Sequence, residues 1–268
     1  MNLKIAVCVK SVPNPDQFSS LSLDPVSKTL IREGIDSVIN PADLHAIELA
    51  VQLKEQYGAH ISLISMGPQQ AQKELRMGLA YGPDDAFLVS DREFGGADSL
   101  ATSYVLAKAL EKAGPFDLII LGNESADGAT AHVPSQVGII MGLPNMTDIV
   151  GFSLDENGKT RVKKRLQGRY AIYEAELPLV IGVAKDINKV RTAGMRGVLG
   201  AKNKPLTVWS VENFEDLDKT RIGLSGSPTQ GGEYHTASFG REATELKGSP
   251  EEIASELSNI IRPILGRE

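Results

Sequence analysis

The residues best suited to binding a ligand lie in the middle of the chain, in the stretch LIILGNESADGATAHVPSQVG at 118–138. An apolar run ends at Gly122, and short, hydroxyl and amide side chains follow as far as Pro134. A helix beginning near Thr130 would direct its free N–H groups and the positive end of its dipole at an anion beside the loop. Spacing alone leaves two interpretations: a strand–loop–helix corner capped by Asp127, or a phosphate-binding site.

Three other stretches, Cys8–Pro13, Asn40–Asp43 and Ser65–Pro68, place small or polar residues where a strand ends or a helix begins. The expected strands are Ile5–Val9, Ile61–Ser65, Ala86–Val89 and Leu118–Leu121; expected helices begin at Pro41 and cover Gln69–Ala80 and Ser99–Ala113, the last capped by Asp98. Alternating strands and helices predict an α/β protein with a doubly wound, mostly parallel sheet. Such sheets bind ligands at the carboxyl ends of their strands, so these stretches predict one nucleotide site.

Whole-chain properties exclude several functions. The net charge of −6 in 268 residues gives no basic field for nucleic acid or an anionic membrane. The one cysteine, Cys8, excludes an internal disulfide and an iron–sulfur site built from this chain's thiolates. The four histidines lack metal-ligand spacing, and neither the G-x-G-x-x-G nor the P-loop pattern occurs. Without a signal peptide or an apolar run near the roughly 20 residues that span a bilayer, we expect a cytoplasmic protein without membrane insertion.

The second half of the chain changes character. Asn157-Gly158, between β-forming runs, predicts a hairpin in an antiparallel meander that extends the sheet. A smaller hairpin is expected around Leu21–Leu23 and Thr29–Ile31. We expect a first domain over 1–204, then an extended linker and a C-terminal helix over 205–268, with Ser249 as the helix cap. The apolar face of that helix needs a cover, and the long polar tether favours a partner subunit over its own domain.

The segment KDINKVRTAGMRGVLGAKNKP at 185–205 interleaves basic residues with glycines around Met195. A solvated surface loop and an anchor for another protein both fit this composition. Methionine suits an anchor because its flexible thioether adapts to different apolar surfaces.

Together these stretches resemble the beta (small) subunit of electron transfer flavoproteins across essentially the whole chain. The matching pieces are VCVKSVP (7–13), INPADLHAIELA (39–50), SMGP (65–68), LGNESADGATAHVP (121–134), VKKRLQGRYAIYEAELPLV (162–180) and RTAGMRGVLGAKNK (191–204). The resemblance implies a fold of the adenine-nucleotide-binding type, a heterodimer with an alpha subunit, and a C-terminal arm that reaches that subunit. It also implies that 185–205 is a recognition loop for a partner dehydrogenase, with Met195 as its apolar anchor and Arg191, Arg196 and Leu199 beside it.

The cofactor depends on which branch of that family the chain resembles. Members that hold AMP have bulkier acidic and polar residues in the loop at 122–134, whereas electron-bifurcating members hold FAD and resemble D-G-x-T-A-x-V. Asp127–Val133 follows the second pattern, with Ala129 where an acidic residue is most common, and GGADSLATS (95–103) also resembles that type. A tricyclic isoalloxazine needs a wall without large side chains, and AMP does not.

The resemblance therefore implies that FAD on this chain takes hydride from NADH and divides the electrons. One goes to ferredoxin or flavodoxin, and the other goes to an alpha-subunit FAD and on to an acyl-CoA-dehydrogenase-type or similar flavoprotein. The alternatives are a non-bifurcating electron carrier with structural AMP, and a stand-alone nucleotide-binding regulator. The cofactor-binding residues implied are Cys8, Asn40, Asp43, Ser65, Met66, Gly67, Thr102, Gly122, Asn123, Ser125, Asp127, Gly128, Ala129, Thr130, Ala131, Val133 and Pro134.

Overall fold

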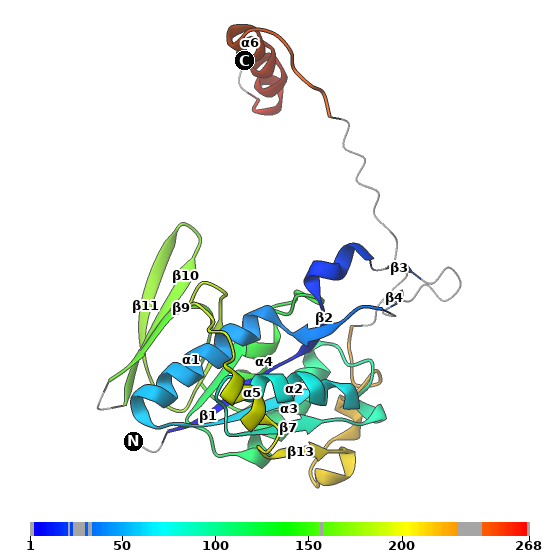
Figure 1. Ribbon diagram of the computed structural model, residues 1–268, viewed down its shortest axis with the longest axis vertical. Helices are drawn as coiled ribbons and strands as arrows, with labels where there is room; N and C mark the ends of the chain where they lie inside the picture. The colour runs from blue at the N-terminus through cyan, green and yellow to red at the C-terminus, as the bar shows by residue number, and fades with distance from the viewer. Residues whose placement is uncertain are drawn as a thin grey trace. The chain divides into compact units, whose positions relative to one another are not determined.

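The computed structural model describes residues 3–20, 22–23, 30–31, 34–155, 158–229 and 243–266. The chain divides into two compact units, Met1–Gly232 and Glu233–Glu268. The first unit is built around a nine-stranded sheet (Figure 1). The predicted α/β class with a mostly parallel central sheet is therefore confirmed.

Seven of the nine strands run parallel to one another. They are β1 (Lys4–Cys8), β6 (His60–Met66), β7 (Asp85–Val89), β8 (Leu118–Gly122), β9 (Asn145–Leu154), β12 (Leu179–Val183) and β13 (Leu206–Trp209). The hairpin strands β10 (Lys159–Leu166) and β11 (Arg169–Glu176) continue from β9 in antiparallel fashion. The spatial order is β11-β10-β9-β12-β8-β1-β6-β7-β13.

The strand order reverses beside β1. The chain passes from β1 to β6 and β7 on one side, and then returns to place β8 on the other side of β1. Strands β1 and β8 are paired in register, with Cys8 opposite Leu121. Because ligands bind outside the carboxyl ends of parallel strands at such a reversal, the site is expected beyond Cys8 and Gly122.

Helices cover both faces of the sheet (Figure 1). They are α1 (Pro41–Tyr57), α2 (Gln72–Leu79), α3 (Ser99–Ala113), α4 (Val133–Ile140) and α5 (Met195–Ala201). Short 3₁₀ turns are η1 (Pro15–Ser20), η2 (Gln69–Ala71), η3 (Arg92–Phe94), η4 (Val211–Asn213) and η5 (Lys219–Arg221). Strand β1 shows the division: Ile5 and Val7 pack with α1 and α2, whereas Ala6 and Cys8 pack with α3. Strands buried on both sides explain the continuous apolar runs of the sequence.

Local sequence signals account for the helix starts. Asp98 caps α3 by accepting hydrogen bonds from the N–H groups of Leu100 and Ala101, as predicted. Pro41 occupies the first turn of α1, where its missing N–H costs nothing. The meander is also confirmed by the β9–β10–β11 pairing, and the small hairpin by the antiparallel pair β3 (Ser22–Leu23) and β4 (Leu30–Ile31). The residues between β3 and β4 lie outside the described part. A further two-stranded sheet joins β2 (Ser11–Pro13) and β5 (Ser37–Ile39).

Two strands of the nine-stranded sheet were not expected from the sequence. Strand β12 lies between β8 and β9 and runs parallel to both, beyond the antiparallel meander that the sequence predicts. Strand β13 falls after residue 204, where the linker was expected to begin, and it pairs with β7 at the edge of the sheet. The first unit consequently extends to Gly232.

The second unit contains α6 (Pro250–Ile264). Ser249 and Glu252 form a capping box at its start, as the sequence predicts. The apolar side chains of Leu257, Ile260 and Ile264 are exposed. Among the residues that the structure describes, none of the helices is both long enough and apolar enough to cross a membrane.

Candidate functional site

A cleft of about 740 Å³ lies at the carboxyl ends of β1, β6, β7 and β8. Its walls continue into the first turns of α3 and α4, and Thr229 closes one side. Small-molecule and cofactor sites have volumes of roughly 300–1,000 Å³, so this cleft is of cofactor size. It occupies the place where the strand order reverses, as expected for a doubly wound sheet.

Most of the predicted cofactor-binding residues line this cleft. They are Cys8, Asn40, Asp43, Met66, Gly67, Thr102, Gly122, Asn123, Ser125, Asp127, Gly128, Thr130, Ala131, Val133 and Pro134. Ser65 and Ala129 are not among the lining residues; Ser65 is buried within β6, and Ala129 is exposed in the loop. The contacts of these residues with a ligand stay a prediction.

The sequence analysis missed one wall of the cleft, the segment that follows β7. The additional lining residues include Asp91, Phe94, Gly95, Gly96, Ala97, Asp98 and Ser99, with Lys10, Leu106 and Thr229 from other elements. A signal was present, because GGADS places small residues between a strand and a capped helix, as the loop at 122–134 does. Thr229 had no such signal; it belongs to an irregular stretch that packs back on Asp98, whose Oδ2 accepts the Thr229 N–H at 3.0 Å.

Asn40 ties the start of α1 to the loop after β8. Its Nδ2 donates to the backbone oxygen of Glu124 at 2.9 Å, and its Oδ1 accepts the N–H of Ala126 at 3.0 Å. The side chain is buried, so these bonds replace those that it would make with water. Asn40 therefore shapes the cleft wall, in addition to its predicted place among the cofactor-binding residues.

Asp43 lies beneath the same loop. Its carboxylate accepts hydrogen bonds from the N–H of Lys10 at 2.7 Å, the N–H of Gly122 at 3.1 Å and the Nδ2 of Asn40 at 3.0 Å. Burial disfavours the charged form more than these donors favour it, and the pKa of Asp43 is raised to about 7. This carboxyl joins the ends of β1 and β8, the two strands at the reversal.

An ion pair crosses the mouth of the cleft. Lys10 Nζ lies 2.7 Å from Asp127 Oδ1 and 3.4 Å from Ser125 Oγ. Burial opposes ionisation of Asp127, but the ammonium group of Lys10 and the donors of Ser125 and Gly128 outweigh it and lower the pKa of Asp127. The pair positions the Asp127-Gly128 turn of the loop against Lys10 in the segment that follows β1.

The end of the loop can receive an anion. Ala131 has a φ of 53° and His132 follows in the right-handed region, the alternation that turns successive N–H groups toward one point. Within the described residues, the N–H groups of Thr130, Ala131 and His132 have no hydrogen-bond acceptor. Helix α4 begins at Val133, later than the expected start near Thr130, because the left-handed residue Ala131 interrupts the helical backbone.

The cleft holds donors and acceptors rather than a nucleophile. Burial and the nearby Asp43 carboxylate raise the pKa of the Cys8 thiol far above its usual range, so the thiol stays neutral. Within the described residues, no group of three or more His, Cys, Asp or Glu is arranged to hold a metal ion. The arrangement therefore suits binding and orienting a nucleotide.

The predicted partner-binding residues lie outside the cleft. Met195, Arg196 and Leu199 belong to α5 and are exposed, whereas Arg191 precedes the helix and binds Glu48 and Glu55. The segment at 185–205, predicted as a loop, thus contains a short helix that presents its apolar residues.

A doubly wound sheet, a cofactor-sized cleft at the strand reversal and unbonded N–H groups beside that cleft are the features of a nucleotide-binding protein of the α/β class. The comparison with known families narrows this class, because the electron transfer flavoprotein domain matches residues 27–213. The chain belongs to the electron transfer flavoprotein family.

Individual relatives agree with this assignment. The chain is 39% identical over 229 residues to the electron transfer flavoprotein subunit beta of Clostridium acetobutylicum, covering 85% of this chain and 86% of that one. It is 36% identical over 229 residues to the caffeyl-CoA reductase-Etf complex subunit CarD of Acetobacterium woodii, with coverage of 85% and 86%. It is 34% identical over 233 residues to the protein FixA of Azorhizobium caulinodans, with coverage of 85% and 82%. The predicted resemblance to beta subunits is confirmed.

Proposed function

We propose that this chain is the beta subunit of an electron-bifurcating electron transfer flavoprotein and that its cleft holds FAD. The observation that carries the proposal is the size of the cleft, about 740 Å³, together with the spread of its lining residues from Cys8 and Gly122 at the strand reversal to Thr102 in α3. An adenylate would use the part near the strand ends. The continuation toward α3 leaves room for three fused rings.

The side chains along this continuation are small, which supports a large planar ligand. Gly95, Gly96, Ala97 and Ser99 form the wall after β7, and Gly128, Thr130 and Ala131 form the wall after β8. At Gly122, an added Cβ would lie 2.2 Å from Asp43 Oδ1, so the backbone there already packs as closely as sterics allow. Small residues on both walls are the property that separates a flavin site from an AMP site.

The residues at the cleft take distinct roles in this proposal. Cys8, Asn40 and Met66 lie at the adenosine end, with Ser65 packed behind them. The N–H groups after Thr130 hold the pyrophosphate, which the positive end of α4 also favours. Asn123, Ser125 and Asp127 hydrogen-bond around the flavin, and Thr102 lies at its far edge. FAD bound in this way would accept hydride from NADH and pass one electron to ferredoxin or flavodoxin and the other to the FAD of an alpha subunit.

The partners in the proposal follow from the same family. A heterodimer with an alpha subunit would cover the exposed apolar side chains of α6, and the segment at 185–205 would dock an acyl-CoA-dehydrogenase-type or similar flavoprotein. One supporting observation is the name of the relative CarD, which is a subunit of a caffeyl-CoA reductase-Etf complex.

Anaerobic titration of the purified heterodimer with NADH tests the proposal. We expect NADH to bleach the flavin absorbance of the complex without any added dehydrogenase. If NADH leaves the flavin oxidised, the bifurcating role is wrong, and the chain is better described as a non-bifurcating beta subunit.

A further inference from the structure

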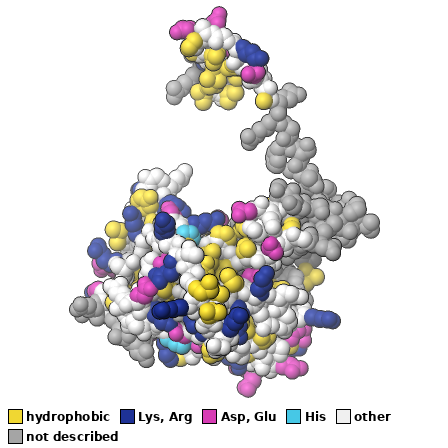
Figure 2. Space-filling model, in the orientation of Figure 1, with side chains coloured by type: hydrophobic (Ala, Val, Ile, Leu, Met, Phe, Trp, Pro, Cys, Tyr) yellow, Lys and Arg dark blue, Asp and Glu magenta, His cyan; other side chains and the backbone are white. Residues whose placement is uncertain are grey.

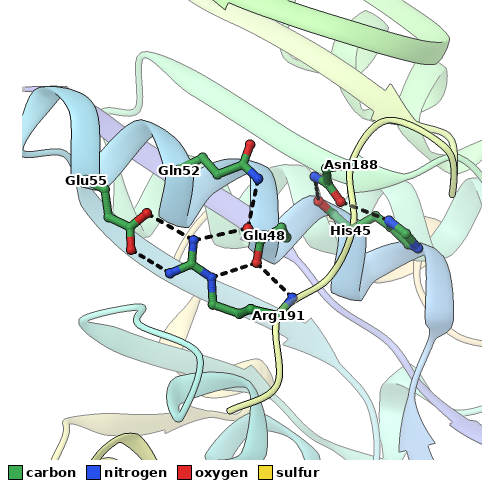
Figure 3. A network of polar contacts seen from close by, with 6 residues as sticks. All are labelled: His45, Glu48, Gln52, Glu55, Asn188 and Arg191. Atoms are coloured by element: carbon green, nitrogen blue, oxygen red, sulfur yellow. Dashed lines mark hydrogen bonds and ion pairs between the residues drawn. The ribbon is translucent and has the colours of Figure 1, made fainter. Parts of the chain in front are cut away.

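The segment at 185–205, which we call the docking segment, lies along one face of α1. His45, Glu48, Gln52 and Glu55 are spaced three or four residues apart, so they form one row on that helix. Figure 3 shows Asn188 and Arg191 of the docking segment facing this row. Asn188 Nδ2 donates to the backbone oxygen of His45 at 2.9 Å, and its Oδ1 lies 2.9 Å from His45 Nδ1.

Arg191 binds two carboxylates of the row at once. Its Nε and Nη2 lie 2.8 and 3.0 Å from the two oxygens of Glu48, and its Nη1 and Nη2 lie 2.5 and 3.0 Å from those of Glu55. The backbone N–H of Arg191 also donates to Glu48 Oε2 at 3.2 Å. Both pairs are bidentate, the geometry in which the planar guanidinium binds carboxylates most strongly. The guanidinium of Arg191 is thus bound by two carboxylates of α1.

Burial makes the Glu48 contact the stronger of the two. The Glu48 side chain is 4% exposed, whereas that of Glu55 is 61% exposed. Burial opposes ionisation of Glu48, but hydrogen bonds from Arg191 and Gln52 outweigh it and lower the pKa of Glu48. A carboxylate this buried is unable to touch another protein, so its effect on docking can only pass through Arg191.

The other end of the docking segment is fixed on α2. Arg76 Nη1 donates to the backbone oxygens of Ala201 and Lys204 at 3.0 and 2.5 Å. In return, Lys204 Nζ donates to the backbone oxygen of Leu79 at 3.0 Å. Gly197 packs so closely on α2 that an added Cβ would lie 2.2 Å from the oxygen of Ala80. The segment is therefore held at both ends by basic side chains that turn inward.

Apolar side chains remain on the outer face between the two ends. Met195 is 75% exposed and Leu199 is 59% exposed, and their i, i+4 spacing places them on one side of α5. Figure 2 shows hydrophobic side chains gathered near the centre of the face that carries α2 and α5, with basic side chains around them. The docking segment thus presents a preformed apolar surface.

We propose that Arg191 is a positioning residue: it fixes the docking segment on α1 so that Met195 and Leu199 are held ready for a partner, and it does not itself contact the partner. This inference rests on the proposed function for the existence of a redox partner at this surface. It replaces the direct contact that the sequence implies for Arg191. If Arg191 contacts the partner directly, replacing Glu48 should leave docking unchanged. If Arg191 positions the docking segment, replacing Glu48 should weaken docking.

Amide hydrogen exchange over 186–204 in the purified heterodimer tests the positioning directly. We expect Arg191→Gln and Glu48→Gln each to speed exchange by about tenfold, because each breaks charged hydrogen bonds. The double variant should exchange no faster than Arg191→Gln alone, since Arg191→Gln already removes the contact with Glu48 as well as that with Glu55. Arg191→Lys should fall between, because an ammonium keeps the charge but lacks the planar fork that makes bidentate pairs with both carboxylates. The matched control is Arg196→Gln, an exposed arginine of the same segment, which should leave exchange unchanged.

A kinetic readout separates positioning from general destabilisation. With a purified acyl-CoA dehydrogenase as the probe, Arg191→Gln and Glu48→Gln should raise the KM for the dehydrogenase by a similar factor, with kcat and the reduction of the complex by NADH unchanged. If Arg191→Gln raises this KM while Glu48→Gln does not, or if neither variant alters exchange, the positioning role is wrong. If wild-type complex takes no electrons from NADH, the proposed function fails, and the exchange data still decide the role of Arg191.

Discussion

Lys10 and Asp127 form an ion pair of 2.7 Å between the segment that follows β1 and the loop after the adjacent strand β8. The two residues are 117 positions apart in the chain and meet where the strand order reverses. The pair fixes the spacing of two cleft walls that would otherwise be joined mainly through Asn40 and Asp43.

Removing this ion pair should weaken cofactor binding. Lys10→Met leaves Asp127 and its loop less ordered, and because the pair is partly exposed we expect a loss of about 0.5–1 kcal/mol, roughly a two- to fivefold rise in Kd. Calorimetric titration of the cofactor-free heterodimer with FAD measures it. Lys4→Met, at the other end of the same strand, is the control, and an equal effect from both variants would argue against a specific role for Lys10.

Filling the close contact at Gly122 should destabilise the fold. In Gly122→Ala the new methyl group would meet Asp43 Oδ1 and the Cβ of Ala42 at 2.2 and 2.8 Å, so we expect a loss of about 1–3 kcal/mol in the free energy of unfolding. Urea denaturation provides the measurement. In the control Gly200→Ala, nothing lies within 4 Å of the new Cβ, and helix propensity predicts a neutral or slightly stabilising change. Equal stability of the two variants would mean that β8 tolerates a shift away from α1.

The stability contributed by Asp43 should depend on pH. Its pKa is raised from 3.8 to about 7, so the folded protein keeps a proton that the unfolded chain has lost between these values. Between these two pKa values the folded state binds more protons than the unfolded chain. The free energy of unfolding therefore falls as the pH rises through that window, by at most about 1.4 kcal/mol per pH unit, and it levels off above the window. Asp43→Asn removes this slope.

Urea denaturation at pH 5, 6, 7 and 8 measures the difference between wild type and Asp43→Asn. We expect the free energy of unfolding of the wild type to fall relative to that of the variant as the pH rises. A difference that is constant over the whole series would show that Asp43 ionises near its ordinary pKa and that its three donors outweigh burial.

Blocking the far end of the cleft should separate FAD from AMP. Thr102 lines the cleft in α3, so Thr102→Phe fills space that the isoalloxazine requires and an adenylate does not. We expect the flavin content of the heterodimer to fall while adenine binding persists. Leu100→Phe, on the same helix but not on the cleft wall, should keep the flavin. Retention of all flavin by Thr102→Phe would place the ring system elsewhere.

Much of the fold could be predicted because its signals are local. The apolar runs of β1, β6, β7 and β8 and the cap at Asp98 identify themselves within a few residues. Strands β12 and β13 were missed because their places are set by pairing with distant strands, which short windows do not reveal. The start of α4 was predicted near Thr130 instead of at Val133, because alanine ordinarily favours a right-handed helix and nothing in the sequence indicates that Ala131 is left-handed.

The candidate site likewise combines residues that local sequence patterns predict with contacts between distant residues that they do not. Residues in the loop that follows β8, such as Asp127 and Thr130, could be placed at the cleft from the strand-end rule. Lys10 falls within the predicted stretch Cys8–Pro13, but its ion pair could not be predicted, because the carboxylate lies on another loop. The family resemblance placed Arg191 among the partner-binding residues, yet Glu48 and Glu55 lie 143 and 136 positions away and bind it within the chain.

The most direct test of the central claim, that the cleft of this chain holds FAD, is the nucleotide content of the heterodimer. Acid release followed by chromatography counts FAD and AMP per complex. Subtracting the one FAD proposed for the alpha subunit gives the nucleotide that this chain binds. The account predicts two FAD and no AMP for each heterodimer. One FAD with one AMP would contradict it and would make the chain a structural support for the flavin of its partner.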